Sequence, residues 1–165
     1  MKIGILGSGT VAQTLGAGLI KLGYNVKLGT RDPGKLDEWF DKVSGRGTVG
    51  SFEDAAAFGE MVFNCTAGMH SIEALRSARA ENLAGKILVD VANPLDFSSG
   101  MPPTLSVSNT DSLGEQIQRT FPEARVVKTL NTVNASVMIN PAALPGKHTV
   151  FVSGNDADAK AQVTE

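Results

Sequence analysis

Small residues near the start of the chain are spaced to bind a diphosphate. Gly7-Ser8-Gly9-Thr10-Val11-Ala12 has the form G-x-G-x-x-A and directly follows the apolar segment Lys2–Leu6. Gly7 permits a turn that a side chain would obstruct. Gly9 lets a pyrophosphate approach the backbone at the start of a helix, where unpaired N–H groups and the helix dipole favour anions. Ala12 keeps that helix close to the preceding strand, so the motif predicts a dinucleotide-binding turn.

The segments around this motif complete a β-α-β unit. Apolar residues follow at helical spacing before Gly23 ends the helix: Val11, Leu15, Leu19 and Leu22. Asn25–Gly29 then reads as a second strand, so the unit is complete within about thirty residues. This context favours a cofactor-binding turn over a glycine-rich turn that only packs tightly.

The segment after the second strand bears on which nucleotide binds. Enzymes selective for NAD usually place a carboxylate there for the ribose 2′-hydroxyl, whereas a 2′-phosphate needs cations and hydroxyl donors. Arg31 can fork onto the phosphate or lie against the adenine, Thr30 can donate a hydrogen bond, and Lys35 can add a charge. NADP is therefore favoured. Two alternatives stay open: Arg31 and Lys35 are solvated surface charges, or the strand ends two residues later and presents Asp32 to the ribose.

Strand and helix patterns alternate along the rest of the chain. They predict an α/β fold, a Rossmann-type doubly wound and mostly parallel sheet with helices on both faces. Further strands are expected at 48–51, 61–66, 86–92, 125–130 and 148–153. Helices are expected at 36–43, after Ser51, after a capping box at Ser112 and Glu115, and from Asn155. The long loop from Leu95 to Asn109 is expected to cover the site or to contact a partner chain.

Three loops after predicted strands are expected to line one crevice, because ligands of such sheets lie across the carboxyl ends of the strands. Thr66-Ala67-Gly68-Met69-His70 follows the fourth strand, Asn93-Pro94 the fifth, and Asn131-Thr132 the sixth. Their small and polar groups predict a nicotinamide-sized site.

Several separate segments also match one family in the right order. They are GSGTVA at 7–12, the Thr30-Arg31 dipeptide, the His70 loop, VDVANP at 89–94 and VVKTLNT at 126–132. The sequence resembles the NADP-dependent oxidoreductases typified by the reductase of the deazaflavin coenzyme F-420, and the related cytosolic domain of the STEAP metalloreductases. The resemblance spans nearly the whole chain. It implies NADP bound by Ser8, Thr10 and Val11 at the turn, by Thr30, Arg31 and Lys35 at the 2′-phosphate, and by Thr66, Ala67 and Asn93 beside the ribose and nicotinamide.

Hydride transfer between two flat heterocycles needs few side chains, since the cofactor carries the reactive atom and the protein positions the rings. We therefore expect neither a catalytic triad nor a metal. His70 matches the family's loop histidine, and two roles stay open for it: a titratable group beside the nicotinamide or acceptor, or only a cap for the helix at Ser71. His148 and Trp39 are expected to be structural. Cys65, inside an apolar segment, is expected to be a buried thiol rather than a nucleophile.

Length and composition predict a single domain over residues 1–165, and the motifs above make it an NADP-binding one. The chain is 42% hydrophobic with a formal net charge of -2, which argues against disorder and against a nucleic-acid-binding surface. The single cysteine suits a reducing compartment, and no apolar segment reaches membrane-spanning length. We expect a cytoplasmic protein with a small-molecule acceptor and with no nucleic-acid or membrane partner. The long loop is compatible with a homodimer.

Two functions of different class remain. The first is an oxidoreductase that transfers hydride between NADP(H) and a deazaflavin such as coenzyme F-420, or a flavin-like acceptor. The second is a non-catalytic NADP(H)-binding or sensing module, or one half of a larger reductase. A dehydrogenase for hydroxy acids or imines is less favoured, because no lysine or carboxylate stands out as a proton donor on a strand-end loop. Unlike the family, the chain ends within the helix predicted from Asn155. We therefore expect it to lack a C-terminal segment that helps to build the acceptor pocket.

Overall fold

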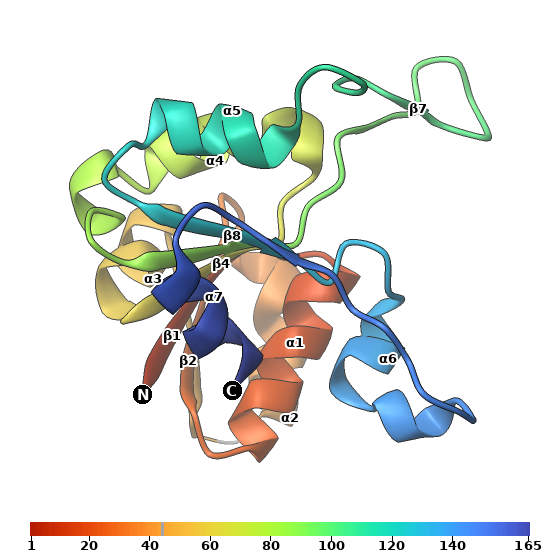
Figure 1. Cartoon of the computed structure of the whole chain (residues 1–165). Coiled ribbons are helices and arrows are strands. Elements are labelled where there is room, and N and C mark those ends of the chain that lie inside the picture. The colour runs from red at the N-terminus through yellow and green to blue at the C-terminus, as the bar shows by residue number, and fades with distance from the viewer. Residues whose placement is uncertain (44) are drawn as a thin grey trace.

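Seven strands form one sheet in the order β3-β2-β1-β4-β5-β8-β9 (Figure 1). The computed structural model describes residues 1–43 and 45–165. All neighbouring strands in the sheet pair in parallel except β8 and β9, which pair antiparallel. The order confirms the Rossmann-type sheet that the sequence predicts. The strands are β1 (Lys2–Leu6), β2 (Asn25–Gly29), β3 (Gly47–Gly50), β4 (Met61–Asn64), β5 (Ile87–Asp90), β8 (Arg125–Thr129) and β9 (Val152–Ser153).

Helices cover both faces of the sheet (Figure 1). One face carries α1 (Thr10–Lys21), α2 (Asp37–Lys42) and α7 (Ala157–Thr164), with α6 (Ala135–Ile139) packed beside α1. The other face carries α3 (Phe52–Phe58), α4 (Ser71–Ser77) and α5 (Leu113–Thr120). Short 3-10 turns lie at Pro33–Leu36 (η1), Gly68–His70 (η2), Ala80–Asn82 (η3) and Pro141–Ala143 (η4).

Alternation along the strands divides the buried side chains into two cores. Val62 and Leu88 point into the core beneath α3, α4 and α5, whereas Phe63 and Val89 point into the core beneath α1 and α2. Trp39, only 4% exposed, packs in the second core and donates its indole N–H to the carbonyl of Gln13 at 2.9 Å. Its structural role, expected from the sequence, is thus confirmed.

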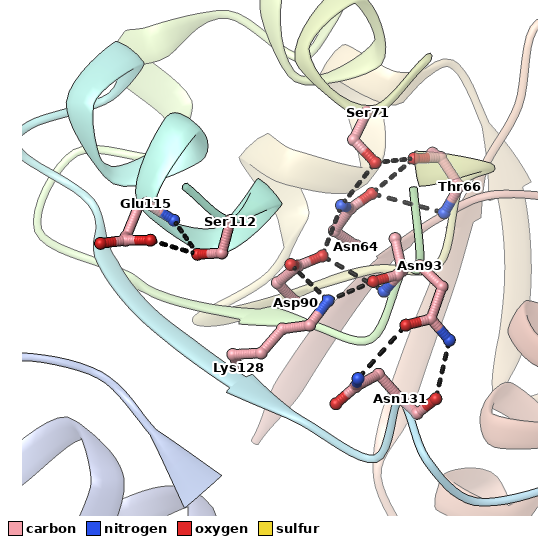
Figure 2. A network of polar contacts seen from close by, with 10 residues as sticks. Asn64, Thr66, Ser71, Asp90, Asn93, Ser112, Glu115, Lys128 and Asn131 are labelled. Atoms are coloured by element: carbon pink, nitrogen blue, oxygen red, sulfur yellow. Dashed lines mark hydrogen bonds and ion pairs between the residues drawn. The ribbon is translucent and has the colours of Figure 1, made fainter. Parts of the chain in front are cut away.

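Side-chain caps start several helices where the sequence predicts them. At α3, Ser51 Oγ accepts from the backbone N–H of Asp54 at 3.0 Å, and the Asp54 carboxylate accepts from the Ser51 N–H at 2.9 Å. The expected capping box at α5 is only half formed. Ser112 Oγ accepts from the Glu115 N–H at 3.2 Å, but the Ser112 N–H donates to Asp111 instead. The Glu115 carboxylate therefore accepts from the Ser112 hydroxyl, as Figure 2 shows.

Several predicted segments differ from the structure. The strand expected at 148–153 is wrong for its first four residues, because residues 141–151 are exposed and only Val152 and Ser153 pair with β8. His148 contacts only the carbonyl of Leu144 among the described polar groups, at 3.1 Å. The loop from Leu95 to Asn109 contains a hairpin, β6 (Leu95–Asp96) and β7 (Thr104–Leu105), which projects from the sheet (Figure 1).

The strands expected at 61–66 and 86–92 end two residues early. Their last residues, Asn64 and Asp90, are fully buried, and their side chains are hydrogen-bonded to each other. The helix expected at 36–43 begins at Asp37, because Pro33–Leu36 forms a 3-10 turn. The helix expected from Asn155 begins at Ala157, where Asp156 caps it through the Ala159 N–H at 2.9 Å.

Replacement of Gly4 by alanine is expected to lower the free energy of unfolding by about 3 kcal/mol. A Cβ at this position in β1 would overlap the carbonyl oxygen of Ala55 in α3, and backbone cannot easily yield. Urea denaturation of both proteins measures the difference.

Gly114→Ala is the matched control in α5. Its Cβ would meet Lys128 Cβ at 3.8 Å, an ordinary contact, so alanine there is expected to be neutral or to stabilise by up to about 1 kcal/mol. Equal unfolding midpoints for Gly4→Ala and the parent chain would contradict the close approach of α3 to β1.

Candidate nucleotide-binding site

The turn between β1 and α1 is built on two glycines with different roles. Gly7 has φ of 136°, a conformation that other residues rarely adopt, and a Cβ there would lie 2.6 Å from the carbonyl oxygen of Cys65. Gly9 has φ of -80°, and its Cβ would meet no heavy atom of the described chain within 4 Å. The fold therefore requires a glycine at position 7. At position 9 it leaves an open cradle beside the backbone, into which a pyrophosphate fits.

The first turn of α1 also suits an anion. Gly9 is the residue before the helix, so within the described chain no side chain caps this end, and the first turn holds no acidic residue. By contrast, α3, α5, α6 and α7 each have a side-chain cap. Unpaired N–H groups and the positive end of a twelve-residue helix thus face the cradle.

A hollow of about 310 Å³ extends from this turn along the carboxyl edge of the sheet. Arg31 and Lys35 line its far end together with Asp32, and all three are exposed. Lys35 Nζ lies 3.9 Å from the Asp32 carboxylate, a loose contact that leaves the ammonium free to turn. The predicted residues that line this hollow are Gly7, Ser8, Gly9, Thr30, Arg31, Lys35, Thr66, Ala67 and His70.

Thr30 lines the first hollow and also holds the turn that carries Arg31. It is only 6% exposed, and its hydroxyl accepts from the Asp32 N–H at 3.2 Å and donates to the Asp32 carbonyl at 3.3 Å. Its hydrogen bond to a 2′-phosphate stays a prediction. β2 ends at Gly29, as expected, so the strand does not slip by two residues.

A second hollow of about 410 Å³ shares Cys65, Thr66, Ala67 and His70 with the first. Loops after β4, β5 and β8 line it, as the sequence predicts. An Asn93–Asn131 pair joins two of these loops: Asn93 Nδ2 donates to the Asn131 carbonyl at 2.7 Å, and Asn131 Nδ2 to Asn93 Oδ1 at 3.2 Å (Figure 2). The predicted residues that line it are Val11, Thr66, Ala67, His70, Asn93 and Asn131.

His70 lines both hollows and is exposed. It precedes α4, but its side chain makes no capping hydrogen bond within the described chain. The capping role that the sequence left open is therefore wrong. The imidazole faces the junction of the two hollows.

Cys65 lies at the same junction, half-buried. Burial, with the charge of Asp90 as a smaller cause, raises the pKa of its thiol far above the ordinary value. The thiol stays protonated near neutral pH and is a poor nucleophile, in line with the structural role expected for it.

Three predicted residues line neither hollow. Ala12 is fully buried and packs α1 against Gly7, Thr10 is exposed at the first helical position, and Pro94 is buried. The Pro94 carbonyl instead anchors β7 by accepting from the Ser106 N–H at 2.9 Å.

The sequence analysis missed one wall of the first hollow, which α4 supplies through Glu73, Ala74 and Ser77. They lie three, four and seven residues after His70, a helical spacing that could have found them.

Residues 1–43 and 45–165 hold no group of three or more His, Cys, Asp or Glu side chains arranged to bind a metal ion. No helix among them is long and apolar enough to cross a membrane.

A Rossmann sheet with an uncapped glycine turn and adjoining cations defines the class of dinucleotide-binding oxidoreductase domains. The family model described as NADP oxidoreductase, coenzyme F420-dependent, matches residues 2–94. The chain belongs to this family of NADP-dependent oxidoreductases.

Individual relatives agree with this membership. The metalloreductase STEAP3 of Rattus norvegicus is 32% identical over 164 residues, which are 99% of this chain but 31% of the rat protein. A solved structure provisionally described as an F420-dependent NADP reductase, from Arthrobacter sp. FB24, is 57% identical with a TM-score of 0.95. The match covers 99% of this chain and 78% of that one. An imine reductase from Pseudomonas sp. shares the fold, with a TM-score of 0.69 at 20% identity over 99% of this chain and 50% of its own.

Gly9→Ala is expected to weaken NADPH binding about 10-fold or more without lowering the melting temperature. The added methyl group meets no atom of the chain, yet it fills the cradle where the pyrophosphate would lie. Isothermal titration with NADPH, paired with a thermal melt, measures both quantities. Undiminished NADPH affinity would show that the nucleotide does not use this turn.

Proposed function

We propose that the protein transfers hydride between NADP(H) and a flat heterocyclic acceptor of the deazaflavin or flavin type. The observation that carries this proposal is the pair of joined hollows along one edge of the sheet, with an uncapped helix at the centre and Arg31 and Lys35 at one end. The family membership and the 57% identity to the Arthrobacter protein support it.

The residues of the first hollow fit the adenosine half of NADP. The N–H groups at the start of α1 would hold the pyrophosphate beside Gly9. Arg31 would form charge-assisted hydrogen bonds to the 2′-phosphate, and Lys35 would add a mobile charge. Thr30 would act through the turn that it holds. Asp32 lies between Arg31 and Lys35 in the sequence, and its contact with Lys35 is loose. The Lys35 ammonium could therefore turn from Asp32 to a bound 2′-phosphate.

The residues of the second hollow fit the nicotinamide and its acceptor. Thr66, Ala67 and Asn93 present small or polar groups at the carboxyl edge of the sheet, opposite the apolar side chains of Val11 and Met138. Phe97, 55% exposed, adds an aromatic surface from the hairpin. A wall of this kind suits a planar ring stacked on the nicotinamide.

The chain's contribution to the reaction is positioning. Bound NADPH would supply a hydride from its nicotinamide ring, and the acceptor would take up that electron pair. The second hollow would hold the two rings together, with the adenosine half of the cofactor in the first, and this would lower the entropic cost of bringing the rings together. Met69 of the β4 loop and Leu95 and Phe97 of the hairpin also line the second hollow. His70 lines both hollows, and its imidazole would lie beside the acceptor.

A second candidate is a nucleotide-binding module without turnover of its own, or one half of a larger reductase. It is favoured by the length of the curated relatives, since the chain spans 31% of the STEAP3 sequence. A cytoplasmic location and a small-molecule partner belong to both proposals, and the single cysteine suits the reducing compartment.

Arg31→Ala is expected to weaken NADPH about 10- to 100-fold and NADH less than about threefold, because only NADPH carries the phosphate that the guanidinium would bind. Titration of both nucleotides into both proteins measures the ratio. Equal losses for the two nucleotides would refute the phosphate assignment.

Two further variants sharpen this test. Arg46→Ala removes an exposed arginine just before β3, at the amino end of the strands and away from the hollows, and is expected to change neither affinity. Asp32→Asn tests the other reading of the turn. If it weakens NADH while Arg31→Ala changes nothing, the carboxylate binds the ribose and the domain prefers NAD.

Turnover distinguishes the two candidate functions. We expect steady oxidation of NADPH with at least one of coenzyme F-420, FMN or a ferric chelate, followed as loss of nicotinamide absorbance. Tight NADPH binding without turnover on any of these acceptors would favour the binding module.

A further inference from the structure

A buried carboxylate lies directly beneath the second hollow. Asp90, the last residue of β5, is fully buried, and each of its oxygens is hydrogen-bonded. Asp90 Oδ1 accepts from Asn64 Nδ2 at 2.8 Å and from the Ala92 N–H at 3.2 Å. Asp90 Oδ2 accepts from Lys128 Nζ at 2.8 Å, and the same ammonium donates to the Ala92 carbonyl. Figure 2 shows Asp90 between Asn64 and Lys128, which come from β4 and β8.

The network continues from this ion pair into the loop after β4. Asn64 is also fully buried, and its Oδ1 accepts from the Thr66 hydroxyl at 2.7 Å and from the Thr66 N–H at 3.3 Å. Asn64 Nδ2 donates to Ser71 Oγ at 3.0 Å, and the Ser71 and Thr66 hydroxyls lie 2.8 Å apart (Figure 2). Thr66, which lines both hollows, is therefore held on two sides.

The same ion pair fixes the loop after β5. Ala92 is bound at its N–H by Asp90 and at its carbonyl by Lys128, and it directly precedes Asn93 in the second hollow. The Asn93 carbonyl accepts from the Gly68 N–H at 3.1 Å, which joins the β5 loop to the β4 loop. A Cβ at Gly68 would overlap this carbonyl, so the two loops touch through backbone alone.

Stability by itself is a weak reason for such a network. Removing two charges from water costs free energy that their attraction rarely exceeds, and packed apolar residues often stabilise a core equally well. The charges also lie at the one edge of the sheet where a ligand would bind. Among the described residues, the side chains of Asp90, Asn64 and Ser71 form hydrogen bonds only with one another and with Thr66, Ala92 and Lys128, all at this end of the strands.

We propose that Asp90 and Lys128 are positioning residues for the nicotinamide. Acting through Asn64 and Ala92, the pair fixes the positions of Thr66 and Asn93 beside the reactive ring. Thr66 also lines the first hollow, but among the described residues the network forms no hydrogen bond with Gly9, Arg31 or Lys35, which would bind the phosphates. This inference rests on the proposed binding of NADP(H). Small displacements of a reacting ring are costly, so loosening these loops is expected to slow hydride transfer far more than it weakens binding.

The test separates the two halves of the cofactor in the full chain. Lys128→Met keeps the aliphatic stem and removes the ammonium. Adenosine 2′,5′-bisphosphate, which lacks the nicotinamide, is expected to bind Lys128→Met within about threefold of the parent affinity. The enhanced emission of bound NADPH is expected to fall by at least about half, and single-turnover oxidation of NADPH to slow about 10- to 100-fold.

Lys86→Met is the matched control. Lys86 is a partly buried lysine at the opposite end of β5, where its Nζ donates to the Ala56 carbonyl at 2.8 Å. Its loss is expected to lower stability and to leave the emission and the oxidation rate unchanged. Emission changes of equal size in both variants would overturn the proposal, as would a loss of bisphosphate affinity equal to the loss for NADPH in Lys128→Met.

A milder variant covers a failure of Lys128→Met to fold. Ser71→Ala removes one hydroxyl from the network and is expected to give a smaller change of emission in the same direction. Unchanged emission in Ser71→Ala would then overturn the proposal. If the parent chain binds neither NADPH nor the bisphosphate, the proposed function itself fails, which is a separate result.

Discussion

Close approach of backbone to backbone around β1 is the constraint on which the rest of the structure depends. β1 lies between β2 and β4, and a Cβ at Gly4 would overlap α3, while one at Gly7 would press on the β4 loop. Because both side chains are absent, α3 can lie against the sheet, and the loop after β4 can reach the turn before α1. The two joined hollows exist only because these segments meet.

The two ends of the site use different electrostatics. Near the turn before α1, the groups suited to an anion are backbone N–H groups and the exposed, mobile side chains of Arg31 and Lys35. At the other end, the charges are buried, paired with each other and directed at the loops rather than at a ligand. The first arrangement suits tight retention of a phosphate, whereas the second suits a neutral ring that must be held at a set distance from its reaction partner.

Local patterns predicted the elements that depend on neighbours in the sequence. The β1-α1-β2 unit and the helix after Ser51 follow from periodicity and short-range hydrogen bonds, and the structure confirms them. Predictions failed where a partner distant in the sequence decides the outcome. Residues 148–151 have the composition of a strand, but they meet no strand partner, and only Val152 and Ser153 reach β8.

The sequence by itself determined the fold class, the glycine turn before α1 and the family, because glycine spacing, apolar periodicity and a few short motifs are properties of contiguous residues. Only the tertiary structure decided that Thr30 bonds to Asp32, that the His70 side chain does not cap α4, and that Asp90, Asn64 and Lys128 form one network. These residues are 26 and 38 positions apart, and hydrogen bonding between them depends on three strands lying side by side in one sheet. The sequence of one strand does not show which strand lies beside it. The ion pair of Asp90 with Lys128 can therefore be identified only when the register of the sheet is known.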